Sequence, residues 1–229
     1  MINATPTPSR LGSGFDAFDD IRCLTSAGRS HLVARSYERF AELGVAHRVR
    51  LFDGSFVDEL EHPEPTAAYR WRSRYLTSLS HREVWRAALS AGSQRLLVME
   101  DDIGFVEWDQ SAFDAAVADL PDDWQVLYIG YILRQPAKLP PARLRGRHLL
   151  EFDGDADVRS GVCYALNLQH AEQLSSYDPA TDGVVDRWLS EHLRTLCVHP
   201  LMAVEDQTLR GRYKPDWFLQ NASKVEIRS

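Results

Sequence analysis

Apolar side chains follow two alternating patterns along this chain. Over residues 30–43 they recur every three or four positions, which is the spacing of an amphipathic helix. Residues 95–99 instead contain an uninterrupted apolar run, which is typical of a buried strand. The same criteria predict further helices at 66–91, 170–175 and 182–193. They predict further strands at 21–25, 45–52, 124–131, 148–152, 162–166 and 195–204.

This alternation of strands and helices predicts one α/β domain over residues 21–229, with a mainly parallel central sheet flanked by helices. Residues 1–20 begin with a Pro- and Gly-containing stretch that has no apolar run, so we expect a flexible N-terminal arm there. No segment approaches the roughly 18 consecutive apolar residues of a transmembrane helix. We therefore expect a cytoplasmic protein, and the sequence leaves peripheral association with the inner membrane face open.

The composition narrows the classes of partner. The 229 residues include 26 Lys and Arg against 33 Asp and Glu, which gives a formal net charge of −7. An acidic chain lacks the basic field that nucleic-acid binding requires, so we expect no nucleic-acid partner. The three cysteines, Cys23, Cys163 and Cys197, are far apart and form no CxxC pair. They predict no disulfide framework and indicate a reducing compartment.

Three consecutive carboxylates, Glu100, Asp101 and Asp102, directly follow the apolar run at 95–99. Ligands of open α/β sheets bind at the carboxyl ends of strands. Adjacent carboxylates repel one another, and a Mg²⁺ or Mn²⁺ ion shared with substrate phosphates would relieve that repulsion. An acidic surface loop, or acidic residues at a helix start, explain the same residues about equally well.

Several motifs occur in the order seen in the family 25 glycosyltransferases. The motifs are Ser80-His81 followed by Trp85, the strand ending in Glu100-Asp101-Asp102, a strand ending at Gly130, and Gly161-Val-Cys-Tyr164. Over residues 21–207 the chain therefore resembles this family, which includes bacterial lipooligosaccharide galactosyltransferases and collagen galactosyltransferases. Residues 24–29 depart from the family pattern, because they lack its Asn-Leu strand end.

The resemblance implies a GT-A type fold and a role such as lipopolysaccharide biosynthesis. The implied reaction transfers galactose or another hexose from a UDP-sugar to a glycan, lipid-linked or protein hydroxyl, with inversion. Mn²⁺ or Mg²⁺ would be held by Asp102, Glu100 and the late histidine His199. The implied donor-binding residues are Ser80, His81, Arg74, Glu100, Asp101 and Gly161.

An inverting transfer needs a base for the acceptor hydroxyl, and Asp186 is the first candidate. A solvated acid favoured by the helix dipole is the alternative for Asp186, and a helix N-cap is the alternative for Asp182. Gly161 and Gly130 would allow close approach of backbone or ligand, although a turn is the simpler account of Gly130. We expect Trp85 to lie in the core.

Two other functions compete with the transferase. A metal-dependent phosphohydrolase would use the same acidic residues, but the DxDx[TV] motif of haloacid-dehalogenase-type enzymes is missing after the first strand. A catalytically decayed protein that still binds sugar nucleotides would explain the departure at residues 24–29. Retention of Glu100, Asp102 and Ser80-His81 weighs against the decayed protein.

Overall fold

The computed structural model describes residues 13–26, 28–58, 72–133, 142–152, 157–206 and 227–228. The strands are β1 (Asp20–Thr25), β2 (Val49–Asp53), β3 (Arg95–Glu100), β4 (Ile103–Phe105), β5 (Val126–Leu133), β6 (Ala142–Arg145), β7 (Leu149–Phe152), β8 (Val158–Asn167), β9 (Thr195–Val198), β10 (Ala203–Glu205) and β11 (Ile227–Arg228). The α-helices are α1 (Ser30–Glu42), α2 (Arg72–Ser90), α3 (Gln110–Ala118), α4 (Pro179–Asp182) and α5 (Val185–His192). Short 3-10 helices are η1 (Gly14–Ala17), η2 (Ala46–Arg48), η3 (Gly54–Asp58) and η5 (Glu172–Ser176).

The described strands belong to one sheet with the order β11-β6-β7-β9-β5-β8-β3-β1-β2, and β10 pairs with β4 and β5 beside this path. The sheet is mixed, so the expectation of a mainly parallel sheet is corrected. β1 runs parallel to β2 and β3, whereas β8 runs antiparallel to both β3 and β5. A central antiparallel strand that is buried on both faces has the same continuous apolar run as a parallel one, so its direction was not predictable from that run.

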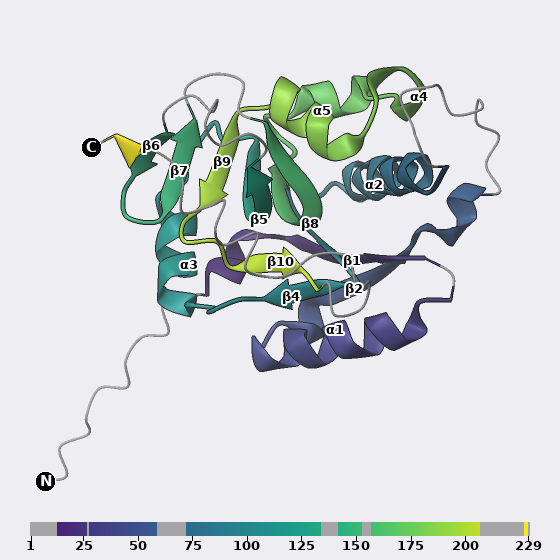
Figure 1. Ribbon diagram of the computed structural model, residues 1–229, viewed down its shortest axis with the longest axis horizontal. Coiled ribbons are helices and arrows are strands. Elements are labelled where there is room, and N and C mark those ends of the chain that lie inside the picture. Colours follow the sequence, from purple (N-terminus) through teal and green to yellow (C-terminus); the bar gives the residue numbers. More distant parts are fainter. Residues whose placement is uncertain are drawn as a thin grey trace, which may run out of the picture.

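Helices cover both faces of the sheet. Leu96 and Val98 of β3 pack in one buried cluster with Trp85 of α2, whereas Leu97 and Met99 pack in a second cluster on the opposite face. This alternation follows from the two-residue period of a strand. Figure 1 shows α2 and α5 on one side of the β1–β3 region and α1 on the other side. The fold is therefore α/β with a mixed central sheet between helical layers.

Most of the predicted elements are present. The strands at 21–25 and 95–99 and the helix at 30–43 are confirmed as β1, β3 and α1. The helix predicted at 66–91 corresponds to α2, and its first six residues lie outside the described part of the chain. The expected strand at 45–52 begins only at Val49, because the preceding residues form η2.

Three predicted elements differ from the observed ones. The helix at 182–193 is divided into α4 and α5 by Gly183, whose φ of 84° is a conformation that favours glycine. The segment at 195–204 is divided into β9 and β10 by a cis peptide bond between His199 and Pro200. The helix at 170–175 is the 3-10 helix η5. Turns and proline geometry interrupt these apolar runs without changing their hydrophobic pattern.

Part of the predicted N-terminal arm is folded. Phe15 and Phe18 are buried, and the ring of Phe15 packs on those of Trp108 and Phe113. These contacts attach η1 to the region around α3, so the arm expected over residues 1–20 is wrong for residues 13–20. Residues 1–12 lie outside the described part of the chain.

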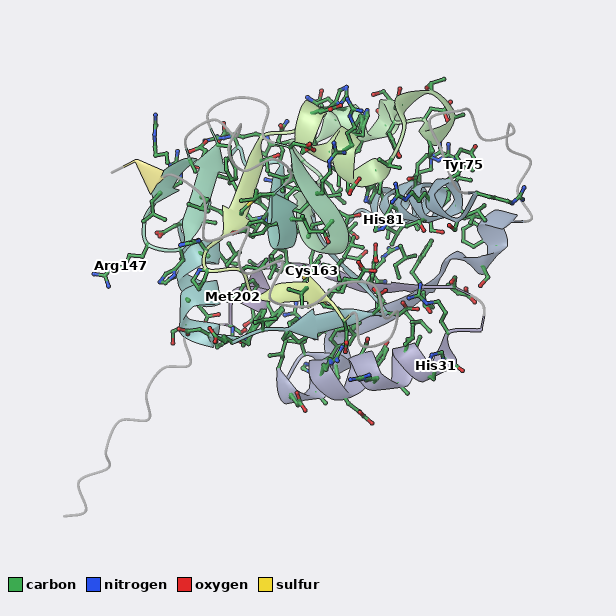
Figure 2. All side chains as sticks on the ribbon, in the orientation of Figure 1. His31, Tyr75, His81, Arg147, Cys163 and Met202 are labelled. Atoms are coloured by element: carbon green, nitrogen blue, oxygen red, sulfur yellow. The ribbon has the colours of Figure 1, made fainter. Side chains whose placement is uncertain are left out.

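The expected core position of Trp85 is confirmed, because Trp85 is buried. The three cysteines are free thiols and are buried as well. Figure 2 shows Cys163 on β8 in the middle of the molecule. Within the described residues, no helix combines the length and apolar character needed to cross a membrane.

Candidate functional site

A cleft with a cavity volume of about 100 Å³ lies where the carboxyl ends of β1 and β3 meet α2. Its lining residues come from the end of β1 and the turn that follows, from one face of α2, and from the end of β3: Leu24, Thr25, Ser26, Arg29, Thr77, Ser80, Glu100 and Asp101. Leu24 is paired with Glu100 in the parallel register of β1 and β3, so the two strands end together. This is the edge of an α/β sheet at which ligands bind.

Arg29 neutralises part of the acidic cluster. Its Nη2 lies 2.7 Å from Asp101 Oδ1 and 3.2 Å from Asp102 Oδ2. Both carboxylates are buried, whereas the Arg29 side chain is 27% exposed and lines the cleft. The Thr25 hydroxyl donates to Asp101 Oδ2, and the backbone N–H of Asp206 donates to the Asp102 carbonyl at 2.6 Å. The cluster is thus held by side-chain and backbone contacts from three parts of the chain.

Two of the three consecutive carboxylates pair with a guanidinium. Asp101 and Asp102 contact Arg29, and Glu100 contacts His81. In the part of the chain that the structure describes, no group of three His, Cys, Asp or Glu side chains is arranged to hold a metal ion. Asp102, which the family resemblance implies as a metal ligand, therefore has Arg29 as its cationic partner here.

A chain of hydrogen bonds connects the core to Glu100. The indole Nε1–H of Trp85 donates to the Tyr164 hydroxyl at 2.8 Å, and His81 Nδ1 lies 2.8 Å from the same hydroxyl. His81 Nε2 lies 3.1 Å from Glu100 Oε1. Trp85, Tyr164 and His81 are buried, and the Glu100 side chain is 20% exposed in the cleft. His81 is labelled at α2 in Figure 2, on the side of the helix that faces the sheet.

Gly161 of β8 packs directly against the contact between His81 and Glu100. A Cβ atom at this position would lie 2.8 Å from Glu100 Oε1 and 3.0 Å from His81 Nε2. A side chain there would require the Glu100 carboxylate or the His81 ring to shift, so the expected close approach at Gly161 is observed. The same holds for Gly130, where a Cβ would lie 2.8 Å from the Ala203 carbonyl oxygen, so the turn expected at Gly130 is wrong.

Asp186 contacts two residues of β8 that precede Gly161. Ser160 has a φ of 107°, which is rare for a residue with a side chain, and its N–H donates to Asp186 Oδ2 at 3.3 Å. Arg159 Nη1 lies 3.8 Å from Asp186 Oδ1. Strained backbone of this kind is concentrated at functional sites. Two consecutive residues of β8 therefore contact Asp186 and Glu100, respectively.

Ser80 and Asp182 occupy ordinary structural positions. Ser80 lines the cleft, and its hydroxyl donates to the Leu76 carbonyl one helical turn earlier at 2.9 Å. Asp182 closes α4 and accepts from the Asp178 N–H at 2.8 Å, so it is not the N-cap of α5.

Two other expected site residues lie away from the cleft. Arg74 is exposed on α2 and is not part of the lining. His199 follows β9, which is three strands from β3 in the sheet order, or roughly 14 Å at the usual spacing. Its backbone pairs with His148, and burial, together with the charge of His148, lowers the His199 pKa.

Sequence reasoning did not identify Arg29 or Tyr164 as site residues. Arg29 lies in the segment 24–29, which departs from the family pattern. Tyr164 belongs to a recognised motif, but its contact with His81 depends on β8 being antiparallel to β3, where Tyr164 pairs with Val98. The spacing of residues along the chain indicates neither the contacts of Arg29 with the aspartates nor the contact of Tyr164 with His81.

No protein-family model matches the sequence. Among solved structures, a UDP-glucose pyrophosphorylase complexed with UDP-glucose is similar in fold, with 9% identity, a TM-score of 0.45, and coverage of 89% of this chain and 80% of that chain. An active-site mutant of LgtC shows 10% identity, a TM-score of 0.42, and coverage of 90% and 83%. A glycosyltransferase involved in glycosylation of the major capsid of PBCV-1 shows 11% identity, a TM-score of 0.36, and coverage of 92% and 82%.

Proposed function

We propose that this protein is a glycosyltransferase that transfers a hexosyl group from a UDP-sugar to a hydroxyl acceptor, and that the cleft at the ends of β1 and β3 holds the donor. The observation that supports the proposal best is the position of the Glu100 carboxylate in the cleft. Its carboxylate contacts a buried histidine and lines the cleft together with Thr25, Thr77 and Ser80. Carboxylates and hydroxyls are the groups that recognise the hydroxyls of a sugar or ribose.

Arg29 is suited to bind the diphosphate of the donor. Guanidinium groups form bidentate contacts with phosphates, and Arg29 is the cationic side chain among the described lining residues. When the leaving nucleotide gains negative charge, a nearby guanidinium stabilises it. The proposal assigns the role of the cation expected from the family resemblance to Arg29, which contacts Asp101 and Asp102.

Asp186 remains the proposed base for the acceptor hydroxyl. The acceptor oxygen would attack the anomeric carbon as its proton passes to the Asp186 carboxylate, and the bond from that carbon to the phosphate oxygen would break to release UDP. Attack opposite the leaving group gives inversion. Ser160 and Arg159 orient the carboxylate, and the side chain is 27% exposed, so an acceptor hydroxyl has access to it.

A calorimetric donor screen tests the proposal. We would titrate the protein with UDP-galactose, UDP-glucose, UDP-N-acetylglucosamine and GDP-mannose, with and without Mn²⁺. One UDP-sugar is expected to bind, and Glu100→Gln is expected to weaken it at least 10-fold. The matched control is Glu191→Gln, because Glu191 lies on α5 and forms an exposed ion pair with Arg187. Failure of the folded wild-type protein to bind any donor would contradict the proposal.

A further inference from the structure

The chain of hydrogen bonds from Trp85 to Glu100 has a defined direction, because Trp85 can only donate a hydrogen bond and an ionised Glu100 can only accept one. An indole N–H donates and never accepts, so the Tyr164 oxygen accepts from Trp85. An ionised carboxylate accepts and never donates, so His81 Nε2 carries the proton that points at Glu100. The two residues between these ends, Tyr164 and His81, must then agree with both assignments.

This requirement indicates which nitrogen of His81 carries the proton when the ring has a single N–H. Nε2 then holds it, and Nδ1 is an acceptor. The group 2.8 Å from Nδ1 is the Tyr164 hydroxyl, which has a proton to donate. That proton is retained, because complete burial raises the Tyr164 pKa well above its usual value of 10. Trp85 therefore donates to Tyr164, Tyr164 donates to His81, and His81 donates to Glu100.

We propose that His81 is a positioning residue, held by Tyr164 as the Nε2–H tautomer, which keeps the Glu100 carboxylate in the orientation that accepts a hydroxyl group of the ligand. The identity of that ligand rests on the proposed function. The tautomer rests only on the contacts among the side chains of Trp85, Tyr164, His81 and Glu100. Gly161 completes the arrangement, since a Cβ there would meet both Glu100 Oε1 and His81 Nε2.

The tautomer can be measured in the protein without any ligand. Two-bond ¹⁵N–¹H correlation spectra of ¹⁵N-histidine-labelled protein distinguish a protonated from an unprotonated ring nitrogen, and the His81→Gln variant assigns the signals of His81. His192 is an internal control of the opposite kind, because its Nδ1 lies 3.0 Å from the Trp188 carbonyl and must donate to it. The expected result is an unprotonated Nδ1 at His81 and a protonated Nδ1 at His192. A His81 ring protonated at Nδ1, alone or together with Nε2, would overturn the assignment.

The positioning role needs a second measurement, with UDP-sugar as the probe. His81→Gln keeps an N–H donor near the place of Nε2, whereas His81→Leu removes it. We expect His81→Gln to bind the donor within about 3-fold of wild type and His81→Leu to lose at least 10-fold, with circular dichroism confirming that both are folded. Equal binding by His81→Leu and wild type would overturn the positioning role. If the wild type binds no UDP-sugar, the proposed function fails, and the tautomer still stands or falls on the spectra alone.

Discussion

Replacing Arg29 with methionine should destabilise the protein by about 2 kcal/mol. The substitution keeps most of the aliphatic volume and removes the guanidinium that lies 2.7 Å from Asp101 and 3.2 Å from Asp102. Breaking a fully buried ion pair costs roughly 3–5 kcal/mol, because a charge is left in a low-dielectric environment. The two aspartates are buried, but the Arg29 side chain is 27% exposed, so solvent screens part of the interaction and reduces the cost.

Urea denaturation at pH 7 measures this loss. With a slope of about 2 kcal/mol per molar urea, the midpoint of Arg29→Met should fall by about 1 M. Arg187→Met is the control, because Arg187 forms an exposed pair with Glu191 one turn along α5, which is worth at most about 0.5 kcal/mol. A loss for Arg29→Met no larger than that of the control would refute the claim that the guanidinium neutralises the acidic cluster.

The same variant tests whether a divalent cation can replace the guanidinium. A ligand that binds only the folded state raises its stability in proportion to the logarithm of ligand concentration. If Asp101 and Asp102 can hold Mn²⁺ once Arg29 is removed, Mn²⁺ will raise the midpoint of Arg29→Met and leave that of the wild type unchanged. Stabilisation of the wild type to the same extent would show that a cation and Arg29 do not compete.

Three further predictions follow from other parts of the structure. Gly161→Ala should weaken UDP-sugar binding at least 10-fold by calorimetry, since its Cβ would lie 2.8 Å from Glu100 Oε1; unchanged binding would show that Glu100 can move without loss. Burial lowers the His199 pKa, so the unfolded chain binds a proton more readily; urea stability should fall as the pH drops below about 6.5, and by less in His199→Asn. Equal pH dependence in both proteins would contradict this. Burial and the nearby carboxylates raise the pKa of Cys23 to about 12, and Cys163 and Cys197 are also buried. Ellman's reagent should therefore label the native protein slowly and should label all three thiols after denaturation. Rapid labelling of the native protein would contradict the buried positions.

The part of the site that sequence reasoning predicted consists of residues fixed by local spacing. Glu100 and Asp101 follow a continuous apolar run, and Ser80 and His81 lie on a helix with a clear period, so their elements could be predicted. That these elements meet follows from a general property of α/β sheets, whose parallel strands end at a common edge. The observed cleft has residues from both elements in its lining.

The rest of the site depends on strand order and direction, which a single sequence does not specify. The family resemblance grouped His199 with Asp102, but β9 lies between β5 and β7 rather than beside β3. Tyr164 reaches His81 only because β8 runs antiparallel to β3. Asp186 reaches β8 through the unusual backbone of Ser160, which no hydrophobic pattern indicates.

The central claim is that the cleft beside Glu100 is the donor site, and mapping the bound ligand by NMR tests it most directly. A ¹⁵N-labelled sample of the 26.0 kDa chain would be titrated with the UDP-sugar that binds in the donor screen. The account predicts that the largest amide shift changes lie at Ser26, Arg29, Thr77 and Glu100. Binding accompanied by shift changes confined to other parts of the molecule, with these four amides unaffected, would contradict it.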